Sequence, residues 1–246
     1  MNSRKKYVQE TSSLDKYRLF CFPYAGGGAS VFRMWQEMLE GINVYSVQYP
    51  GRENRIMEKS IFDITILVNE IYSELKGIIE ECPFILFGHS LGTKVVYELT
   101  LKIYNEKKIW PKAIIVSGGK APYLEENDPI SHLDDEEFIK ELVERYSSIP
   151  DEILQDKEVM NIFLPTLRAD FIMSEKYTNK KMDIIGCPIM GLLGTDDLEM
   201  IFEDLDKWKI LTNKGFYYKY IKGDHMFINK NRNEVIYTIK KFIKNL

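Results

Sequence analysis

The 246-residue chain is predicted to form one α/β domain built on a mostly parallel, doubly wound sheet. Short apolar runs alternate along it with segments of helical periodicity, which is the pattern of successive strand–helix units. Most of these runs are apolar on consecutive residues, as is typical of strands buried on both faces of a parallel sheet. The length also suits one α/β domain, since such domains often reach roughly 250 residues.

The first half of the chain contains three of the expected strands. Residues 18–24 (RLFCFPY) and 44–49 (VYSVQY) are apolar runs of strand length. A helix is expected at 61–79, where apolar residues recur at three- and four-residue spacing. The run at 84–87 (FILF) is the third strand, and a helix at 93–104 follows it with the same periodicity.

Three further strands and two helices are expected from residue 113 onward. Residues 113–116 (AIIV) and 189–193 (IMGLL) are short apolar runs, and 216–221 (FYYKYI) is rich in aromatic residues that favour strands. Helices are expected at about 199–211 and at 234–243.

Residues 120–182 break this alternation, and we refer to them as the cap. They contain no convincing strand and are predicted to form helices at about 134–146, at 150–155 and at 157–175, the last interrupted at Pro165. The insertion follows the carboxyl end of a strand, where open parallel sheets bind their ligands. We therefore interpret it as a helical lid over a site.

The start of the chain and its cysteines indicate a cytoplasmic protein. Residues 1–15 are expected to be a mobile leader to a single domain at 16–246; the leader is basic but lacks the apolar segment of a secretory signal. No apolar run approaches the roughly 18–20 residues of a membrane-spanning helix. Cys21, Cys82 and Cys187 lie in or beside apolar stretches, as buried, reduced thiols do.

Composition excludes several classes of protein. Apolar residues make up 45% and charged residues 28%, which is ordinary for a globular domain. The net charge of −4 lacks the basic surplus expected of a nucleic-acid binder. Three cysteines and three histidines argue against a zinc module or a disulfide scaffold. A histidine-dependent mechanism therefore has only three candidates.

Residues 88–92 (GHSLG) match the pattern G-x-S-x-G, and their context gives the match its weight. They follow the strand at 84–87 and open the helix at 93–104, the strand–turn–helix arrangement of a nucleophile elbow. Such a turn exposes the serine hydroxyl, so Ser90 is the predicted nucleophile. The backbone N–H of Leu91 is then directed at a developing oxyanion.

A serine hydroxyl needs a base, and His225 has the best position for one. It lies in 223–227 (GDHMF), after the last strand and before the last helix, where an α/β-hydrolase carries its base. His89 adjoins the nucleophile and is expected to point away from it as a packing residue. His132, at the start of the cap helices, is interpreted as a solvated or lid-anchoring residue.

The acid that orients the base should follow a strand and precede His225 in the chain. Asp196 and Asp197 both meet this condition, directly after the strand at 189–193. The second oxyanion donor is expected from the Gly-rich loop at 23–28 (PYAGGG), with the Ala25 N–H as candidate. A dinucleotide-binding G-x-G-x-x-G is excluded here, because the last position is Val31.

Taken together, these motifs resemble the type II thioesterases of nonribosomal peptide and polyketide synthesis, over about residues 17–245. The resemblance rests on five blocks: 19–27 (LFCFPYAGG), 50–55 (PGRENR), 87–92 (FGHSLG), 164–170 (LPTLRAD) and 223–227 (GDHMF). It implies an α/β-hydrolase fold with a helical lid. The implied activity is hydrolysis of misprimed or stalled acyl groups from the 4′-phosphopantetheine arm of a carrier protein. It also favours Asp197 over Asp196 as the triad acid.

Two positions depart from the family pattern. Leu198 stands where members often have Pro, and 147–150 (SSIP) lacks the Gly often found before its Pro. Neither change touches the chemistry, but both can alter the lid and the acyl preference. Arg52, Arg55 and Arg168 could bind the phosphate of the pantetheine arm, although structural salt bridges are the favoured interpretation. Apolar cap residues could line an acyl pocket or simply pack the lid; they are Phe138, Leu142, Phe163, Phe171 and Met173.

The predicted enzyme is thus a monomeric, cytoplasmic Ser-His-Asp thioesterase. It has carrier-protein partners, no nucleic-acid or membrane partner and no metal or organic cofactor. A carboxylester hydrolase acting on small free esters would use the same triad. A non-catalytic binding module of the same fold is a further alternative, although such proteins usually lose a triad member and here all three are present.

Overall fold

The computed structural model describes residues 8–10, 16–146, 154 and 156–246. Within them, seven strands form one sheet in the order β1-β3-β2-β4-β5-β6-β7. All neighbouring strands are parallel except β1, which pairs antiparallel with β3. The strands are β1 (Val8–Glu10), β2 (Tyr17–Phe22), β3 (Ile42–Val47), β4 (Phe84–His89), β5 (Ala113–Ser117), β6 (Ile189–Gly194) and β7 (Phe216–Ile221). This is the doubly wound sheet predicted from the apolar runs.

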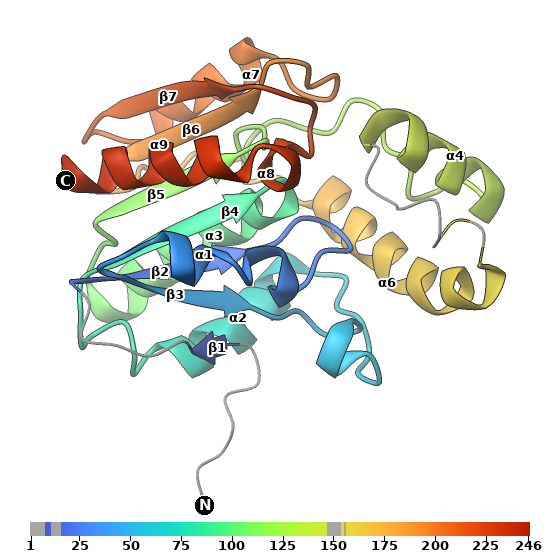
Figure 1. The fold of residues 1–246 in the computed structure, drawn as a ribbon, viewed down its shortest axis with the longest axis horizontal. Helices are drawn as coiled ribbons and strands as arrows, with labels where there is room; N and C mark the ends of the chain where they lie inside the picture. Colours follow the sequence, from blue (N-terminus) through green and yellow to red (C-terminus); the bar gives the residue numbers. More distant parts are fainter. Residues whose placement is uncertain (1–7, 11–15, 147–153, 155) are drawn as a thin grey trace, which may run out of the picture.

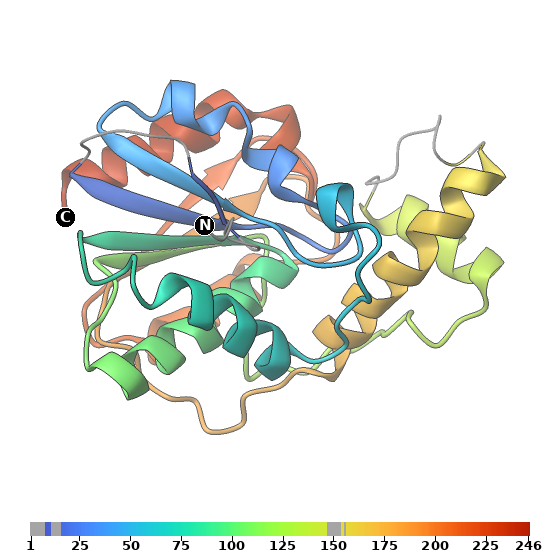
Figure 2. The ribbon, with the colours of Figure 1, turned by 90° about the horizontal axis from the view of Figure 1, so that it is seen from below.

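Helices cover both faces of the sheet (Figures 1 and 2). The α-helices are α1 (Trp35–Met38), α2 (Ile64–Leu75), α3 (Leu91–Lys107), α4 (Asp135–Tyr146), α6 (Lys157–Lys176), α7 (Phe202–Asp206), α8 (Phe227–Lys230) and α9 (Arg232–Lys244). Short 3-10 helices are η1 (Ala29–Phe32), η2 (Glu53–Arg55) and η3 (Lys207–Leu211). The single helix expected at 199–211 is thus divided into α7 and η3.

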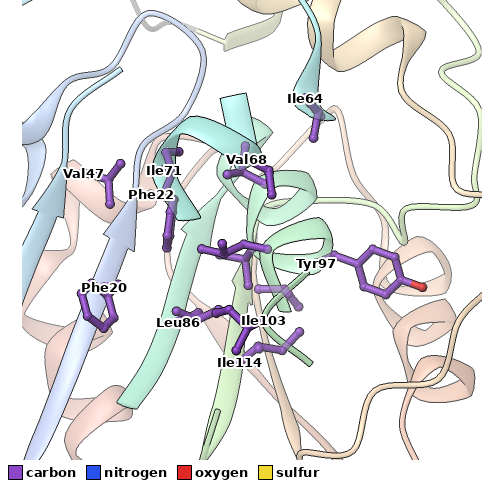
Figure 3. Close-up of a cluster of buried hydrophobic side chains, with 14 of the residues drawn as sticks. Phe20, Phe22, Val47, Ile64, Val68, Ile71, Leu86, Tyr97, Ile103 and Ile114 are labelled. Atoms are coloured by element: carbon purple, nitrogen blue, oxygen red, sulfur yellow. The ribbon is translucent and has the colours of Figure 1, made fainter. Parts of the chain in front are cut away.

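The central strands contribute alternate side chains to two cores, because successive residues of a strand point to opposite faces. On one face, Phe20 and Phe22 belong to a cluster with the buried residues of α2 and α3. On the other, Leu19 and Cys21 pack in a cluster that includes residues of α1 and α9. Figure 3 shows the first of these clusters, with strand residues Phe20, Phe22, Leu86 and Ile114 beside helical Ile64, Val68, Ile71 and Ile103.

Two strands depart from the sequence-based expectations. Residues 8–10, predicted as part of a mobile leader, form β1 at an edge of the sheet, while the rest of 1–15 lies outside the described residues. β7 forms the opposite edge, and four of its six residues are exposed rather than buried. Its aromatic run indicated a strand but not its position, because an edge strand needs strand propensity without full burial.

The cap lies beyond the carboxyl ends of the strands, between β5 and β6 in the chain (Figures 1 and 2). It has its own small core, formed by residues of α4 and α6 that include Phe138, Leu142 and Leu164. The helix expected at 150–155 falls largely outside the described residues, as does the departure at 147–150.

α6 corrects the prediction of a break at Pro165, because the helix continues through it. Proline removes the hydrogen bond to the carbonyl of the residue four positions earlier. Here that residue is Asn161, which is exposed, so water can satisfy its carbonyl. Among the described residues, no helix is long and apolar enough to cross a membrane.

Candidate active site

Ser90 lies at the tight turn between β4 and α3, as the G-x-S-x-G context predicts. Its backbone has φ 52° and ψ −117°, a strained conformation for a residue with a side chain. The turn is held by a hydrogen bond from the Ser90 N–H to the Ser117 carbonyl at 2.8 Å. Strain of this kind persists only where surrounding contacts enforce it, and it is typical of functional sites.

The glycines on either side of the turn are required by close packing. A Cβ on Gly88 would lie 2.2 Å from the Gly92 carbonyl oxygen. A Cβ on Gly92 would lie 2.2 Å from the carbonyl oxygen of Phe22 in β2. The backbone therefore bends sharply enough to present Ser90 only because both side chains are absent.

The structure brings His225 and Asp197 together from two different loops. The His225 Nδ1 lies 2.9 Å from the Asp197 Oδ2, and the side chains are 6% and 0% exposed. Asp196 is exposed, and its N–H donates to the Gly223 carbonyl at 2.9 Å. Between the two acids left open by the strand–loop pattern, Asp197 is the one whose carboxylate contacts the base.

His225 shares a cavity with Ser90. His225 and Ser90 both line it, and the His225 Nε2 is buried without a hydrogen-bond partner among the described residues. The ring of Tyr146 packs edge-on against His225 with the centroids 5.2 Å apart. With Nδ1 held by a carboxylate, Nε2 is the nitrogen available to accept a proton.

His89 is not among the residues that line the cavity, and its ring makes two hydrogen bonds. Its Nδ1 lies 2.9 Å from the Ser117 hydroxyl and its Nε2 3.0 Å from the His225 carbonyl oxygen. Burial lowers the pKa of His89 well below the usual value, and the nearby His225 acts in the same direction. A neutral His89 that donates from Nε2 fixes the loop carrying His225. His132, by contrast, is exposed.

Ala25 and Leu91, the predicted oxyanion donors, line the same cavity as Ser90. Leu91 is the first residue of α3, and Ala25 follows β2 in the Gly-rich loop. This loop is anchored on both sides of Ala25, because the Gly27 N–H donates to the Tyr24 carbonyl at 2.9 Å and the Gly26 N–H to the Asp170 Oδ2 at 2.7 Å. The cap helix α6 thus holds the loop through Asp170.

The favoured interpretation of the arginines as structural salt bridges is confirmed. Arg52 and Asp170 form a buried bidentate pair at 2.5 and 2.8 Å, and Arg52 also donates to the Gly27 carbonyl at 3.2 Å. Arg55 pairs with Glu58 at 2.9 Å. Arg168 donates to the Asp135 carboxylate at 2.7 Å.

We expect Asp170→Asn to destabilise the protein by about 3–5 kcal/mol, because it leaves Arg52 buried without its counter-charge. The turnover number should fall as well, since the Gly26 N–H loses its carboxylate acceptor. Urea unfolding and steady-state kinetics measure the two effects. The matched control is Asp135→Asn, which breaks an exposed cap ion pair with Arg168 and should cost less than about 1 kcal/mol. Equal losses in the two variants would contradict this account.

The cavity is small, with a volume of about 70 Å³, and it is lined by both polar and apolar side chains. Of the five apolar cap residues considered for an acyl pocket, only Phe171 lines it, while Phe138 and Leu142 pack inside the cap. Cys21 and Cys187 are buried, whereas Cys82 is only half-buried, and none of the three forms a disulfide within the described residues.

Sequence reasoning missed two polar side chains near the cavity. Asp170 belongs to the family block at 164–170, and its signal is an acid among apolar helix positions, which indicates a buried partner. Lys94 lines the cavity and is only 6% exposed. Its signal is a lysine four residues after Ser90, on the same face of a buried helix.

Comparisons with known proteins identify the family of this chain. The family model described as "Thioesterase domain" matches residues 17–243. Gramicidin S biosynthesis protein GrsT of Aneurinibacillus migulanus is 37% identical to this chain, covering 92% of it and 88% of GrsT.

Two solved structures have the same α/β-hydrolase architecture. One is ClbQ from the colibactin NRPS/PKS pathway, with a TM-score of 0.88 and 26% identity over 94% of this chain and 98% of ClbQ. The other is YbtT, a type II thioesterase from the yersiniabactin NRPS/PKS biosynthetic pathway, with a TM-score of 0.86 and 28% identity over 96% and 97%. This chain therefore belongs to the thioesterase family, as its resemblance to type II thioesterases implied.

Proposed function

We propose that this protein is a serine thioesterase that hydrolyses acyl groups from the 4′-phosphopantetheine arm of carrier proteins. In nonribosomal peptide or polyketide synthesis, this would remove misprimed or stalled acyl chains. The observation that carries the proposal is the buried His225–Asp197 pair. His225 lines the same cavity as Ser90, and its Nε2 has no hydrogen-bond partner among the described residues. The names of GrsT, ClbQ and YbtT, all tied to such biosynthesis, support the substrate class.

The first half of the proposed reaction transfers the acyl group to the enzyme. The Ser90 Oγ attacks the thioester carbonyl while its proton moves to the His225 Nε2, and Asp197 stabilises the resulting imidazolium. The tetrahedral oxyanion accepts hydrogen bonds from the Ala25 and Leu91 N–H groups, each worth roughly 3–4 kcal/mol to such a transition state. The C–S bond then breaks, and the pantetheine thiolate takes the proton from His225.

The second half releases the acid. A water molecule gives its proton to the His225 Nε2 and attacks the acyl–serine ester through the same oxyanion geometry. When the C–Oγ bond breaks, Ser90 recovers its proton from the imidazolium. Side chains and backbone N–H groups complete this cycle, so we propose that it requires no metal or organic cofactor.

The proposed partners and cellular location follow from the proposed substrate. Carrier domains of a synthetase are the expected partners, and a cytoplasmic monomer that meets them transiently suits an editing role. Neither nucleic acid nor membrane enters the scheme. The relatives' biosynthetic roles support carrier proteins as partners.

The decisive experiment compares three kinds of substrate at matched acyl groups: acyl-carrier protein, the free acyl-pantetheine thioester, and the p-nitrophenyl ester. We expect kcat/KM to be highest for acyl-carrier protein. Equal or higher values for the free ester would instead identify a carboxylester hydrolase. Absence of turnover on all three, together with no labelling of Ser90 by a fluorophosphonate probe, would identify a binding module.

A further inference from the structure

The active-site cavity is lined by four charged side chains as well as by apolar ones: Lys94, Lys120, Glu126 and Glu199. A pocket for a plain alkyl chain would not need them, since burying charge is costly unless it is paired. Three of the four are satisfied within the protein. Lys120 and Glu126 form an ion pair at 2.8 Å, and Glu199 hydrogen-bonds the Tyr146 hydroxyl.

Lys94 differs from the other three. Its ammonium donates to the carbonyl oxygen of Ser174, in the last turn of α6, at 2.7 Å. None of the ion pairs found within the described part of the chain includes it. An ammonium has three donors, and only one of them is used by this contact.

The surroundings of Lys94 favour an anionic partner. Burial lowers the pKa of Lys94; Glu126 and Glu175 oppose this effect, and Lys120 adds to it. A carboxylate bound beside the ammonium would add a counter-charge in direct contact and favour the charged form. Because both groups are shielded from water there, the resulting hydrogen bonds would be stronger than at an exposed site.

The position of Lys94 relative to the nucleophile fits the far end of a short acyl group. Residues four apart lie on the same face of a helix, about 6 Å apart along its axis. Helical side chains also lean toward the N-terminus, so the Lys94 side chain leans toward Ser90. The cavity has a volume of about 70 Å³, and one water molecule needs roughly 10–15 Å³ on this measure, so a short acyl group fits beside Ser90.

We propose that Lys94 determines acyl specificity by binding the terminal carboxylate of a short dicarboxylic acyl group, of which malonyl is the smallest example. This rests on the proposed function, because it assumes an acyl group held on Ser90. Lys94 contacts the substrate and takes no part in the proton transfers. The preferred substrates are therefore acyl-carrier thioesters whose acyl chain ends in an anion.

The test compares malonyl-carrier protein with acetoacetyl-carrier protein, whose acyl group has the same number of non-hydrogen atoms but ends in a methyl ketone. For the unmodified protein, kcat/KM should be higher for malonyl. Lys94→Met should lower the malonyl-to-acetoacetyl ratio by about tenfold or more, the usual worth of a hydrogen bond to a charged group. Lys94→Arg should keep the preference, because the positive charge remains.

Two further measurements keep the outcome clear. Lys102→Met removes a lysine of the same helix that is outside the cavity and paired with Glu106 at 3.0 Å, and it should leave the ratio unchanged. If Lys94→Met does not fold, Lys94→Gln retains a donor for the Ser174 carbonyl without the charge, and it should still lose the preference.

The proposal is overturned if the ratio is the same in the unmodified protein and in the uncharged variants. It is also overturned if β-alanyl-carrier protein, with a terminal ammonium, is the preferred substrate, because the carboxylates of the cavity would then select the acyl group. Failure of the proposed function has a different signature: the unmodified protein would hydrolyse none of these carrier thioesters.

Discussion

Ser90→Ala is expected to abolish thioesterase turnover while leaving the fold intact. The substitution removes only the Oγ, which forms the covalent bond to the acyl group in the proposed reaction, and it keeps the backbone donors of the turn. Loss of the nucleophile in comparable triads lowers kcat by about 10⁶-fold. Single-turnover hydrolysis of acyl-carrier protein measures the loss, and thermal unfolding verifies the fold. Alanine also relieves no backbone strain, because φ remains 52°.

The matched control is Ser73→Ala. Ser73 is an exposed serine on α2 whose hydroxyl donates only to the Glu70 carbonyl at 2.7 Å, so its loss should leave turnover unchanged. If Ser90→Ala hydrolysed acyl-carrier protein at a rate near that of the unmodified protein, Ser90 could not be the nucleophile.

Asp197→Asn should lower kcat by about 10⁴-fold with little change in stability. An amide in this position can donate to the His225 Nδ1, which places the imidazole proton on Nε2 and leaves no acceptor for the Ser90 proton. Asparagine has nearly the shape of aspartate, so the 2.9 Å contact with His225 is retained. The effect is therefore electronic rather than structural, and kcat is the quantity to measure.

The neighbouring aspartate provides the comparison. Asp196→Asn changes an exposed side chain one residue away, and we expect kcat to stay within about twofold of the unmodified value. The opposite ranking of the two variants would assign the acid to Asp196. Similar small effects from both would mean that His225 is oriented without a carboxylate.

The strands that are buried on both faces of the sheet could be predicted, because the apolar run that marks each of them lies within a few consecutive residues. The consecutive apolar residues of β4 and β5 are buried throughout, and each strand was expected within one or two residues of where it ends. β1 and β7 were harder, for opposite reasons. The three residues of β1 are too few to show a pattern. The aromatic run of β7 predicts a strand, but such a run does not show whether the strand lies at the edge or in the centre of the sheet.

The residues of the candidate active site also divide into those that local sequence predicts and those that it does not. Ser90 was predictable because the strand, the turn and the helix that shape it are contiguous, and the two glycines that permit the turn stand within the same five residues. The loop of His225 was predictable from its place after the last strand. The role of His89 was not, because its bond to the His225 carbonyl joins residues 136 positions apart.

The choice between Asp196 and Asp197 could not come from residue type and local position alone, because both are aspartates in one loop. In the fold, one carboxylate meets His225, 28 residues away, and the other faces solvent. The Arg52–Asp170 pair is likewise formed across 118 residues, and it connects the cap to the oxyanion loop. The charge inside the cavity depends on how the cap packs against α3, because this packing brings the Lys94 ammonium into contact with the Ser174 carbonyl oxygen.

Local sequence therefore specified most of the strands and helices, the turn that presents Ser90 and the loop of His225, because periodicity and turn chemistry act within about twenty residues. The Asp197–His225 contact, the anchoring of the Gly-rich loop and the polarity of the cavity arose from packing. Each depends on which distant side chains the fold buries together, and burial sets the strength of their electrostatic interactions.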